Sequence, residues 1–579
     1  MANFTRSGNK KPQTLSIDSF KGINLFSPVT GESTNMKNFK ITPDLKLKKR
    51  DGTRLLAEFN GTIRGAWYGK FINDEYTLFV CAGTQIIKYI RETDTKTVLG
   101  NISGQSSGYV NMFYAYSRLY ILDGYDVYMY NGTVFKTLDP YIPLRYENMS
   151  PVGTQFTNGE AMNLLTNKYR CTYRPTSEFD ITYIHRHTIV SVDKICMGGV
   201  DCTHNFTITR NPSTGFMTMV YKTSQLPNLL PLEVYFTSPE PEIPHEILSN
   251  RYHAIFGEYT LPRLFLYGGN RKNEIYYTEK LDNSEGLYII AGNLLRVGEA
   301  KNAVTSVIRQ FDDLMIFTEG DVWSIRNPVI EKDSAYKNYH YTYSLTMISS
   351  SIGNIGFGNV KTIENNLISV ASDGLYSWSI TKIFDERNVK FVSDKLYKGM
   401  SSEFIRNAVT FHNTADGEIW LSYGGEIWIY NYKLDVWYYF DNICANALFM
   451  MDNIAFYNAD KVYIFDENCQ TDNGTPIEAV WESNYMDFDL PQYTKSISRL
   501  YLTVKDRCSI DRVKIKSDRD TEVIFDDLQN GENTPMTFRR RMNISRCRFI
   551  RLSLIHSGTD SAPTVMNLKF TWVHGGERR

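Results

Sequence analysis

The sequence predicts an all-β protein: a β-propeller of about seven blades with an inserted β-sandwich and a C-terminal β-sandwich. Three observations lead to this prediction. The 579 residues include 39 Tyr and 32 Phe but only 19 Pro, and aromatic residues suit half-buried strands. A hairpin motif recurs at intervals close to the length of a propeller blade. The chain is also too long for a single hydrophobic core, so several domains are expected.

The recurring motif is a short apolar strand, a turn that usually contains glycine, and a second strand with Tyr or Trp in alternation. Glycine, Asn and Asp tolerate the positive φ that tight hairpin turns require. Of seven copies, the last has Asn458, Ala459 and Asp460 in place of glycine. The other six turns contain Gly83, Gly124, Gly268, Gly320, Gly374 and Gly424.

The spacing of these glycines favours a propeller. Gly83 and Gly124 are 41 residues apart, and the three steps from Gly268 to Gly424 span 52, 54 and 50 residues. A four-stranded blade takes about 40 to 50 residues. A β-sandwich is the alternative, because it also contains regular hairpins, but it does not ordinarily repeat one motif seven times at blade length.

The step of 144 residues from Gly124 to Gly268 is too long for one blade and indicates an insertion. Strand-like alternation within it predicts a β-sandwich over residues 151–245, with strands at 181–190, 205–208, 216–220 and 232–236. The propeller then comprises residues 61–150 and 246–468. A polar linker follows, and renewed alternation predicts a second sandwich over 469–579. Residues 1–60 remain as an N-terminal basic arm and lead-in.

The charge of the chain is balanced overall but uneven along it. Lys and Arg number 63 against 64 Asp and Glu, so no net field favours nucleic acid or an acidic membrane. Residues 1–54 nevertheless hold eleven basic residues and four acidic ones. This segment is expected to be a solvated basic arm, or an arm that packs on an acidic neighbour or on nucleic acid.

Targeting and redox signals point to a reducing cytoplasm. Lys10 and Lys11 are not followed by the apolar run of a signal peptide, and no stretch reaches about 18 apolar residues, so no membrane span is expected. The eight cysteines are scattered through a large chain, as free thiols would be.

Motifs that resemble catalytic sites lack the context that catalysis needs. Gly104–Gly108 matches the G-x-S-x-G pattern of a nucleophile elbow, but it lies in a predicted loop and not between a strand and a helix. His245-Glu246 begins a zinc-protease pattern, but Ser249 stands where the second His is required. We therefore expect no enzymatic activity.

One group of imidazole and thiol side chains is the best candidate for a metal site. It lacks the close C-x-x-C pair of structural zinc sites, and strand alternation alone places its first two His on one face. We expect ordinary side chains here, with no metal and no cofactor. The candidates are His185, His187, Cys196, Cys202 and His204.

The N-terminal segment resembles the opening of a family of tailed-bacteriophage structural proteins. The resemblance lies in Phe20–Asn24, Asn35–Phe39 and Leu47–Gly52. These segments are similar to the family patterns F-x-G-G/I-x-N, a spaced M/L-x-N, and L-x-x-R-x-G. Trp481, Phe488 and neighbouring residues are similar to the strands that follow the propeller in this family. The positions that carry the N-terminal motif are Phe20, Gly22, Asn24, Asn38, Arg50 and Gly52.

The resemblance implies a virion protein, made in the host cytoplasm, that acts as a head-to-tail connector or tail hub. Such proteins form a closed ring, often a hexamer, below the portal. The implied partners are further copies of this chain, portal or adaptor proteins, tail or fibre proteins, and packaged DNA by non-specific contact. The ring would help to close the portal channel and retain the DNA until ejection.

Two other classes of function remain open. The first is a glycan-binding or tail-adsorption propeller, or a glycosidase, because Ser372–Trp378 resembles a compressed form of the Asp-box of sialidase propellers. The second is a cellular propeller that acts as a protein-binding scaffold. Genes for portal, terminase and capsid proteins beside this one would favour the phage function.

Overall fold

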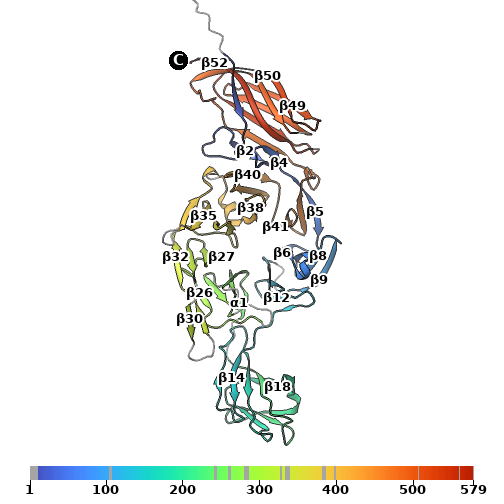
Figure 1. Ribbon diagram of the computed structural model, residues 1–579, viewed down its shortest axis with the longest axis vertical. Coiled ribbons are helices and arrows are strands. Elements are labelled where there is room, and N and C mark those ends of the chain that lie inside the picture. The colour runs from blue at the N-terminus through green and yellow to red at the C-terminus, as the bar shows by residue number, and fades with distance from the viewer. Residues whose placement is uncertain are drawn as a thin grey trace, which may run out of the picture. The chain divides into compact units, whose positions relative to one another are not determined.

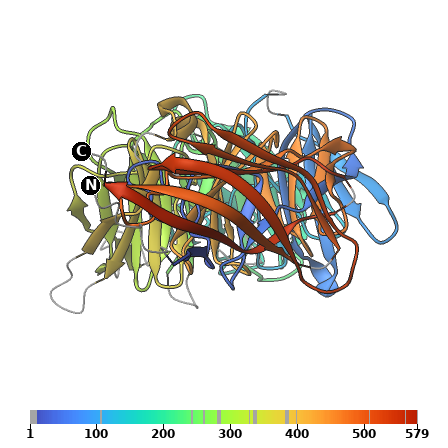
Figure 2. The ribbon, with the colours of Figure 1, turned by 90° about the horizontal axis from the view of Figure 1, so that it is seen from above.

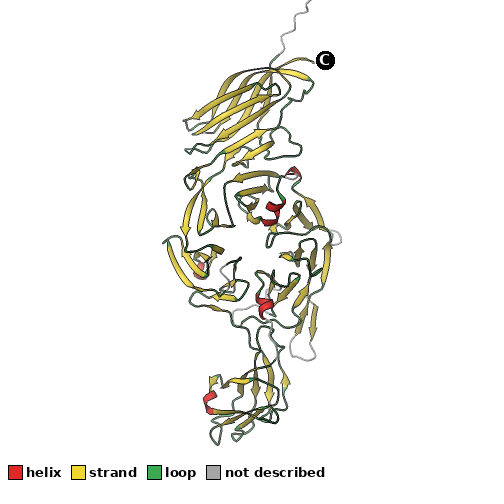
Figure 3. Ribbon diagram, turned by 180° about the vertical axis from the view of Figure 1, so that it is seen from behind, coloured by secondary structure: helices red, strands yellow, loops and turns green. Residues whose placement is uncertain are grey.

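The computed structural model describes residues 11–103, 107–239, 244–257, 262–279, 286–326, 329–332, 339–380, 387–396, 399–505, 507–559 and 561–577. Strands dominate these residues (Figure 3). Their helices are α1 (Pro244–Leu248) and α2 (Ser402–Asn407), with 3-10 turns η1 (Ile72–Asp74), η2 (Thr203–Asn205) and η3 (Asp394–Leu396). The predicted all-β class is confirmed. The chain forms two compact units, Arg64–Gly358, and Met1–Ile63 together with Asn359–Arg579.

The unit Arg64–Gly358 contains four blade-type antiparallel sheets among its described residues. The first two sheets are β6 (Ile63–Lys70), β7 (Tyr76–Ala82), β8 (Gln85–Ile90) and β9 (Thr95–Asn101), then β10 (Asn111–Ala115), β11 (Arg118–Leu122), β12 (Val127–Tyr130) and β13 (Phe135–Thr137). The next two are β23 (Tyr252–Phe256), β24 (Arg263–Tyr267), β25 (Glu274–Tyr277) and β26 (Leu294–Arg296), then β27 (Val304–Gln310), β28 (Asp313–Thr318), β29 (Val322–Ile325) and β32 (Leu345–Ser349). A hairpin of β30 (Val329–Lys332) and β31 (Tyr339–Thr342) interrupts the last sheet.

The middle strands of these sheets are covered on both faces. Every residue of β28 is buried, which explains why the sequence reads as a continuous apolar run and not as an alternating one. Neighbouring sheets share their cores: Tyr277 of β25 and Leu314 of β28 belong to one apolar cluster, and Phe113 of β10 and Leu266 of β24 belong to another. The hairpin repeat therefore reflects stacked, doubly covered sheets.

The inserted domain leaves the propeller between β13 and β23. One sheet contains β14 (Leu144–Met149), β15 (Thr157–Asn158), β16 (Lys168–Tyr173), β18 (Ser191–Met197), β19 (Val200–Asp201) and β22 (Leu232–Thr237). The other contains β17 (Thr182–His185), β20 (Phe206–Arg210) and β21 (Met217–Tyr221). The two sheets share one apolar core, so the inserted sandwich is confirmed.

Two details of the predicted insertion are wrong. The domain begins before residue 151, because β14 pairs with β16. The predicted strand over 181–190 is too long: β17 ends at His185, and residues 186–190 lie outside any strand and cross to β18 in the other sheet. The alternation continues through the crossing because residues of both strands face the same core.

The second unit contains three further blade-type sheets (Figure 1). The strands of the first two are β33 (Lys361–Ile363), β34 (Asn366–Ala371), β35 (Gly374–Ile380) and β36 (Arg387–Phe391), then β37 (Val409–Asn413), β38 (Glu418–Tyr423), β39 (Glu426–Asn431) and β40 (Val436–Asp441). The third joins β41 (Ala447–Met450), β42 (Ile454–Asn458) and β43 (Lys461–Asp466) to β5 (Gly52–Glu58), extended by β44 (Thr471–Asp472) and β45 (Thr475–Pro476). The described residues thus contain seven blade-type sheets, which confirms the predicted propeller.

The C-terminal sandwich is built from two sheets whose long strands are orange and red in Figure 2. One contains β1 (Gln13–Ile17), β3 (Phe39–Ile41), β4 (Leu47–Lys49), β47 (Tyr493–Val504), β50 (Met536–Cys547) and β52 (Thr564–Glu577). The other contains β2 (Ser33–Lys37), β46 (Ala479–Ser483), β48 (Cys508–Ser517), β49 (Glu522–Asn530) and β51 (Ile550–His556).

The N-terminal segment is therefore not an arm in the part that the structure describes. It supplies β1, β3 and β4 to one sandwich sheet, β2 to the other, and β5 to a propeller sheet. Ile17, Phe39 and Leu47 are at most 3% exposed and lie among the basic residues. Their apolar alternation decides the structure of this segment, and its positive charge does not.

The turn glycines adopt several conformations. Gly83 and Gly424 lie in two-residue turns with φ of +59° and +61°, as the motif predicts. Gly124 and Gly268 have positive φ in longer loops, and Gly374, with φ of +145°, is the first residue of β35. Gly320 is not among the positive-φ glycines, so the expectation of a left-handed turn residue is wrong there.

Candidate functional site

Five of the six residues of the N-terminal motif lie at one joint between two propeller sheets and the C-terminal sandwich, and the sixth, Asn24, holds the loop between β1 and β2. Phe20 is fully buried, and its ring packs edge-on against Trp481 of β46, with ring centroids 5.3 Å apart. Gly22 has φ of +76°, and a Cβ at this position would lie 2.4 Å from the Trp437 carbonyl oxygen of β40. The next amide, of Ile23, donates to that same carbonyl at 2.7 Å. Glycine is required here by both the φ angle and the close approach.

Asn24 organises the turn that follows. Its Oδ1 accepts hydrogen bonds from the amides of Phe26 and Ser27, at 3.1 and 3.0 Å. Its Nδ2 donates to Glu32 Oε2 at 2.7 Å, and Glu32 is itself 5% exposed. The asparagine therefore holds the loop between β1 and β2 in a fixed shape.

Asn38 and Arg50 form the centre of the joint. Asn38 Nδ2 donates to Asp441 Oδ1 at 2.5 Å and to the Glu478 carbonyl at 2.7 Å. Its Oδ1 accepts from Arg50 Nε at 2.8 Å and from the Asp441 amide at 3.1 Å. Since Asn38 adopts a φ of 54°, an asparagine also suits the backbone conformation.

Arg50 is 1% exposed and makes a two-point contact with the carboxylate of Asp472. Nη1 donates to Oδ1 at 2.9 Å, and Nη2 donates to Oδ2. A Cβ on Gly52 would lie 2.3 Å from the Thr471 carbonyl oxygen. The chain leaving Arg50 therefore runs against the strand that carries Asp472, where β5 joins its sheet.

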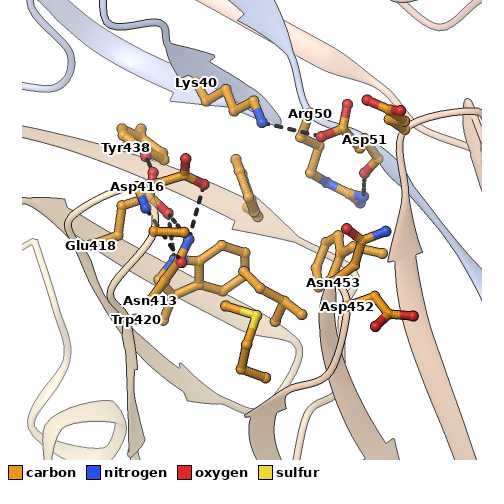
Figure 4. Close-up of a pocket in the computed structure, with 16 residues that line it drawn as sticks. Lys40, Arg50, Asp51, Asn413, Asp416, Glu418, Trp420, Tyr438, Asp452 and Asn453 are labelled. Atoms are coloured by element: carbon orange, nitrogen blue, oxygen red, sulfur yellow. Dashed lines mark hydrogen bonds and ion pairs between the residues drawn. The ribbon is translucent and has the colours of Figure 1, made fainter.

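A cavity of about 200 Å³ opens beside Arg50 (Figure 4). Its polar lining includes Lys40, Asp51, Asp416 and Glu418, and its apolar lining includes Trp420. Lys40 Nζ and Asp51 Oδ2 form an ion pair of 3.1 Å. Burial works against the charged forms of both groups, but their mutual attraction, together with that of Lys48 for Asp51, outweighs it, so the pKa of Lys40 is raised and that of Asp51 is lowered.

Glu418 is the most buried carboxyl group of this cavity, at 5% exposed. It accepts hydrogen bonds from Trp420 Nε1 at 2.8 Å, from Asn413 Nδ2 at 3.2 Å and from the Tyr438 hydroxyl. Burial and the adjacent Glu418 carboxylate raise the pKa of Tyr438 well above its usual range. Since Glu418 already accepts three donors, it acts as a support for the cavity wall.

The aromatic wall of the cavity is also fully packed. Trp420 is 4% exposed and makes edge contacts with Phe440 and Phe465, with centroids 5.6 and 5.4 Å away. A sugar ring stacks on an exposed aromatic face, and Trp420 offers none. The cavity therefore forms part of the structural joint around Arg50.

The residues predicted as metal candidates do not assemble into a ligand set. His185 and His187 lie together, with ring centroids 5.6 Å apart, but His185 Nδ1 contacts the Tyr173 hydroxyl at 3.0 Å. Cys202 Sγ donates to the Ile195 carbonyl, and His204 is exposed on η2. Within the described ranges, no group of three or more His, Cys, Asp or Glu side chains could hold a metal ion.

The other two predicted motifs are also accounted for. Residues 104–106 of the G-x-S-x-G match lie outside the described residues. Glu246, on the five-residue helix α1, pairs with Arg271 at 2.8 Å.

The sequence analysis did not predict the cavity. Asn413, Asp416 and Glu418 share one hairpin, and their polarity within an apolar repeat was a signal that could have indicated it.

Comparisons with known proteins provide no relative by sequence. No protein-family model matches the chain, and no curated protein matches it. Solved structures with similar folds include the AfRom2 CNH domain, at 7% identity over 72% of this chain and 99% of that domain, with a TM-score of 0.36. The WD40 domain of SCAP from fission yeast aligns at 9% identity over 72% and 95% of the two chains, with a TM-score of 0.29.

A third similar structure is the β-propeller domain of Swd1 from Myceliophteria thermophila, at 10% identity over 71% of this chain and 98% of that domain, with a TM-score of 0.32. These likenesses concern the fold alone. Among the described residues, no helix combines the length and the apolar character needed to cross a membrane.

Proposed function

We propose that this chain is a ring-forming structural protein of a tailed-bacteriophage virion, a head-to-tail connector or tail hub without enzymatic activity. The observation that carries the proposal is the role of the residues that resemble the family motif. Five of the six lie at the joint of the propeller and the C-terminal sandwich, where they pack, hydrogen-bond or allow close backbone approach, and Asn24 fixes the loop between β1 and β2. A motif with this role belongs to a shared architecture and not to a shared reaction.

The inserted sandwich supports the proposal with an apolar surface suited to subunit contacts. Val200 is 70% exposed at the hairpin between β18 and β19, and Leu230 is 46% exposed. A Cβ on Gly198 of the same hairpin would lie 2.7 Å from Leu230, so the exposed Leu230 lies against the hairpin that carries Val200. Exposed apolar patches of this kind occur at protein interfaces.

Mass photometry and cryo-electron microscopy of the purified chain test the proposal. We expect one closed ring of uniform copy number, with a hexamer as the first expectation, and the same protein in purified particles. Val200→Asp should lower the copy number, while Val98→Asp, at another exposed valine of the same unit, should not. A chain that stays monomeric at all concentrations and is absent from particles would contradict the proposal.

A further inference from the structure

One face of the C-terminal sandwich presents a group of positive charges. In the sheet of β1, β52, β47 and β50, Leu500, Leu502 and Phe570 are fully buried. Because side chains alternate along a strand, the residues between them face solvent. Among these outward residues, Arg499 of β47 lies opposite Arg541 of β50. Tyr501 of β47 lies between Arg539 of β50 and Lys569 of β52.

The register sets like charges beside each other. Arg499 and Arg541 are direct partners in an antiparallel pair, an arrangement that destabilises a sheet unless an anion is nearby. Arg539 lies over the ring of Tyr501, 6.0 Å from its centroid. A hydrogen bond from Arg499, together with the charges of Arg539 and Arg499, lowers the pKa of the Tyr501 hydroxyl.

The other sheet of the same sandwich provides an internal comparison. There each cation of β48 has a carboxylate partner: Arg512 with Asp526 at 2.8 Å, Lys514 with Glu522 at 3.0 Å, and Lys516 with Asp520 at 3.1 Å. Across the described part of the chain, no carboxylate forms an ion pair with the four cations of the basic face, Arg499, Arg539, Arg541 and Lys569. The charges of the basic face are therefore left for a ligand.

Neutral hydrogen-bonding groups accompany the cations on this face. They lie in the same registers as the cations and include Thr14, Ser16, Thr503, Thr537, Asn567 and Thr571. Arg, Lys, Ser, Thr, Asn and Tyr are the side chains that contact phosphate oxygens in protein–DNA complexes. With strands about 4.8 Å apart, the four strands are roughly 14 Å across, enough to meet several phosphates.

We propose that the basic face binds the phosphate backbone of DNA without sequence preference. The choice of DNA rests on the proposed function, in which the protein meets packaged DNA. An interface with an acidic protein would have an apolar centre. Apart from Tyr501, the residues named on this face are all charged or neutral polar, so this face does not have such a centre. Base-edge readout is not expected from a flat sheet face of this kind.

Fluorescence anisotropy with a labelled 30-base-pair duplex of random sequence tests the proposal on the full chain. Wild-type affinity should fall linearly with the logarithm of salt concentration, with a slope of about −0.9 for each phosphate contacted. The triple variant Arg539→Gln, Arg541→Gln, Lys569→Gln should bind at least about tenfold more weakly at 50 mM salt and reduce the slope by about 2 to 3.

The matched control is Arg512→Gln, Lys514→Gln, Lys516→Gln, which removes the same number of charges from the other sheet. Its affinity should stay within about twofold of wild type, because each of these charges already has a partner. All substituted side chains face solvent, and near-ultraviolet circular dichroism checks that both variants fold. Equal losses in the two variants, or no DNA binding by the wild type, would overturn the proposal.

Two further measurements distinguish failure of the DNA-binding proposal from failure of the proposed function. Competition with polyglutamate distinguishes phosphate recognition from a general affinity for acidic chains, and equal binding of the two polyanions would overturn DNA as the partner. Mass photometry on the same samples reports ring assembly. A ring that binds no DNA contradicts this inference alone, whereas a chain that binds DNA through the basic face but never assembles contradicts the proposed function alone.

Discussion

Arg50 and Asp472 lie 422 positions apart in the chain and form a two-point ion pair at the joint between β5 and β44. The guanidinium side chain is 2% exposed and the carboxylate 17%. Arg50 also donates through Nε to Asn38, so one side chain connects three segments. A planar fork of donors makes such a contact, and a lysine ammonium cannot.

Replacing Arg50 should therefore destabilise the unit that contains it. We expect Arg50→Ala to lower the free energy of unfolding by about 3 to 5 kcal/mol, because it leaves Asp472 without its partner. Arg50→Lys should fall between wild type and Arg50→Ala. Urea denaturation gives the measurement, with Arg54→Ala as the control: its pair with Asp466 is more exposed, and about 1 kcal/mol or less is expected. Similar losses at both positions would contradict this account.

Gly22 offers a second test of the joint. Gly22→Ala places a Cβ 2.4 Å from the Trp437 carbonyl oxygen, in addition to the cost of a positive φ. Gly424→Ala has the same conformational cost, about 1 to 2 kcal/mol, but its Cβ would meet nothing within 4 Å. In thermal or urea unfolding we expect Gly22→Ala to lose at least twice as much stability as Gly424→Ala. Equal losses would mean that the backbone around Trp437 moves aside freely.

The propeller hairpins could be predicted because their signal is local. In β38, five of the six residues are buried, and the two-residue turn that follows contains Gly424 and Gly425. Apolar content and turn chemistry are both visible within some 15 residues. The inserted sandwich was predictable for a similar reason, although its crossing segment after His185 carries no signal that distinguishes it from a longer strand.

The position of the N-terminal segment could not be predicted, because the sequence of a strand does not identify the strand with which it pairs. Residues 52–58 pair with β43, more than 400 positions away, and residues 13–17 pair with β52. Charge counting indicated an arm, while burial of Ile17 and Phe39 shows that the apolar positions prevail. The basic face could not be predicted for the same reason, because Arg499 and Arg541 become neighbours only through cross-strand register.

Acid should destabilise the unit Arg64–Gly358 through the buried His185 and the partly buried His253. Burial lowers the pKa of His185 to about 3 and that of His253 to about 4, so both imidazoles are neutral in the folded state. The unfolded chain titrates near pH 6.5, so it binds more protons than the folded chain below that pH. Stability is therefore fully present above pH 6.5 and is lost as pH falls toward 4, by up to about 1.4 kcal/mol per pH unit for each histidine.

Urea denaturation between pH 7.5 and pH 5 measures this slope. His185→Phe should remove one histidine's share of it, because the new side chain does not titrate. His204→Gln removes an exposed imidazole on η2 and should leave the slope as in wild type. A wild-type stability that is flat over this range, or a slope unchanged by His185→Phe, would show that His185 is not the group responsible.

Thiol labelling tests burial in both units at once. All eight cysteines are free, as their scatter through the sequence predicts. Burial raises the pKa of Cys81 to about 12 and that of Cys547 to about 11, whereas Cys444 is exposed. Since the thiolate is the reactive form, we expect maleimide at pH 7.5 to modify Cys444 at least about 100-fold faster than Cys81 or Cys547. Mass spectrometry identifies the modified residues, Cys444→Ser should abolish the fast phase, and denaturant should expose all eight thiols. Fast modification of Cys81 or Cys547 in the folded protein would contradict the packing of the sheets that contain them.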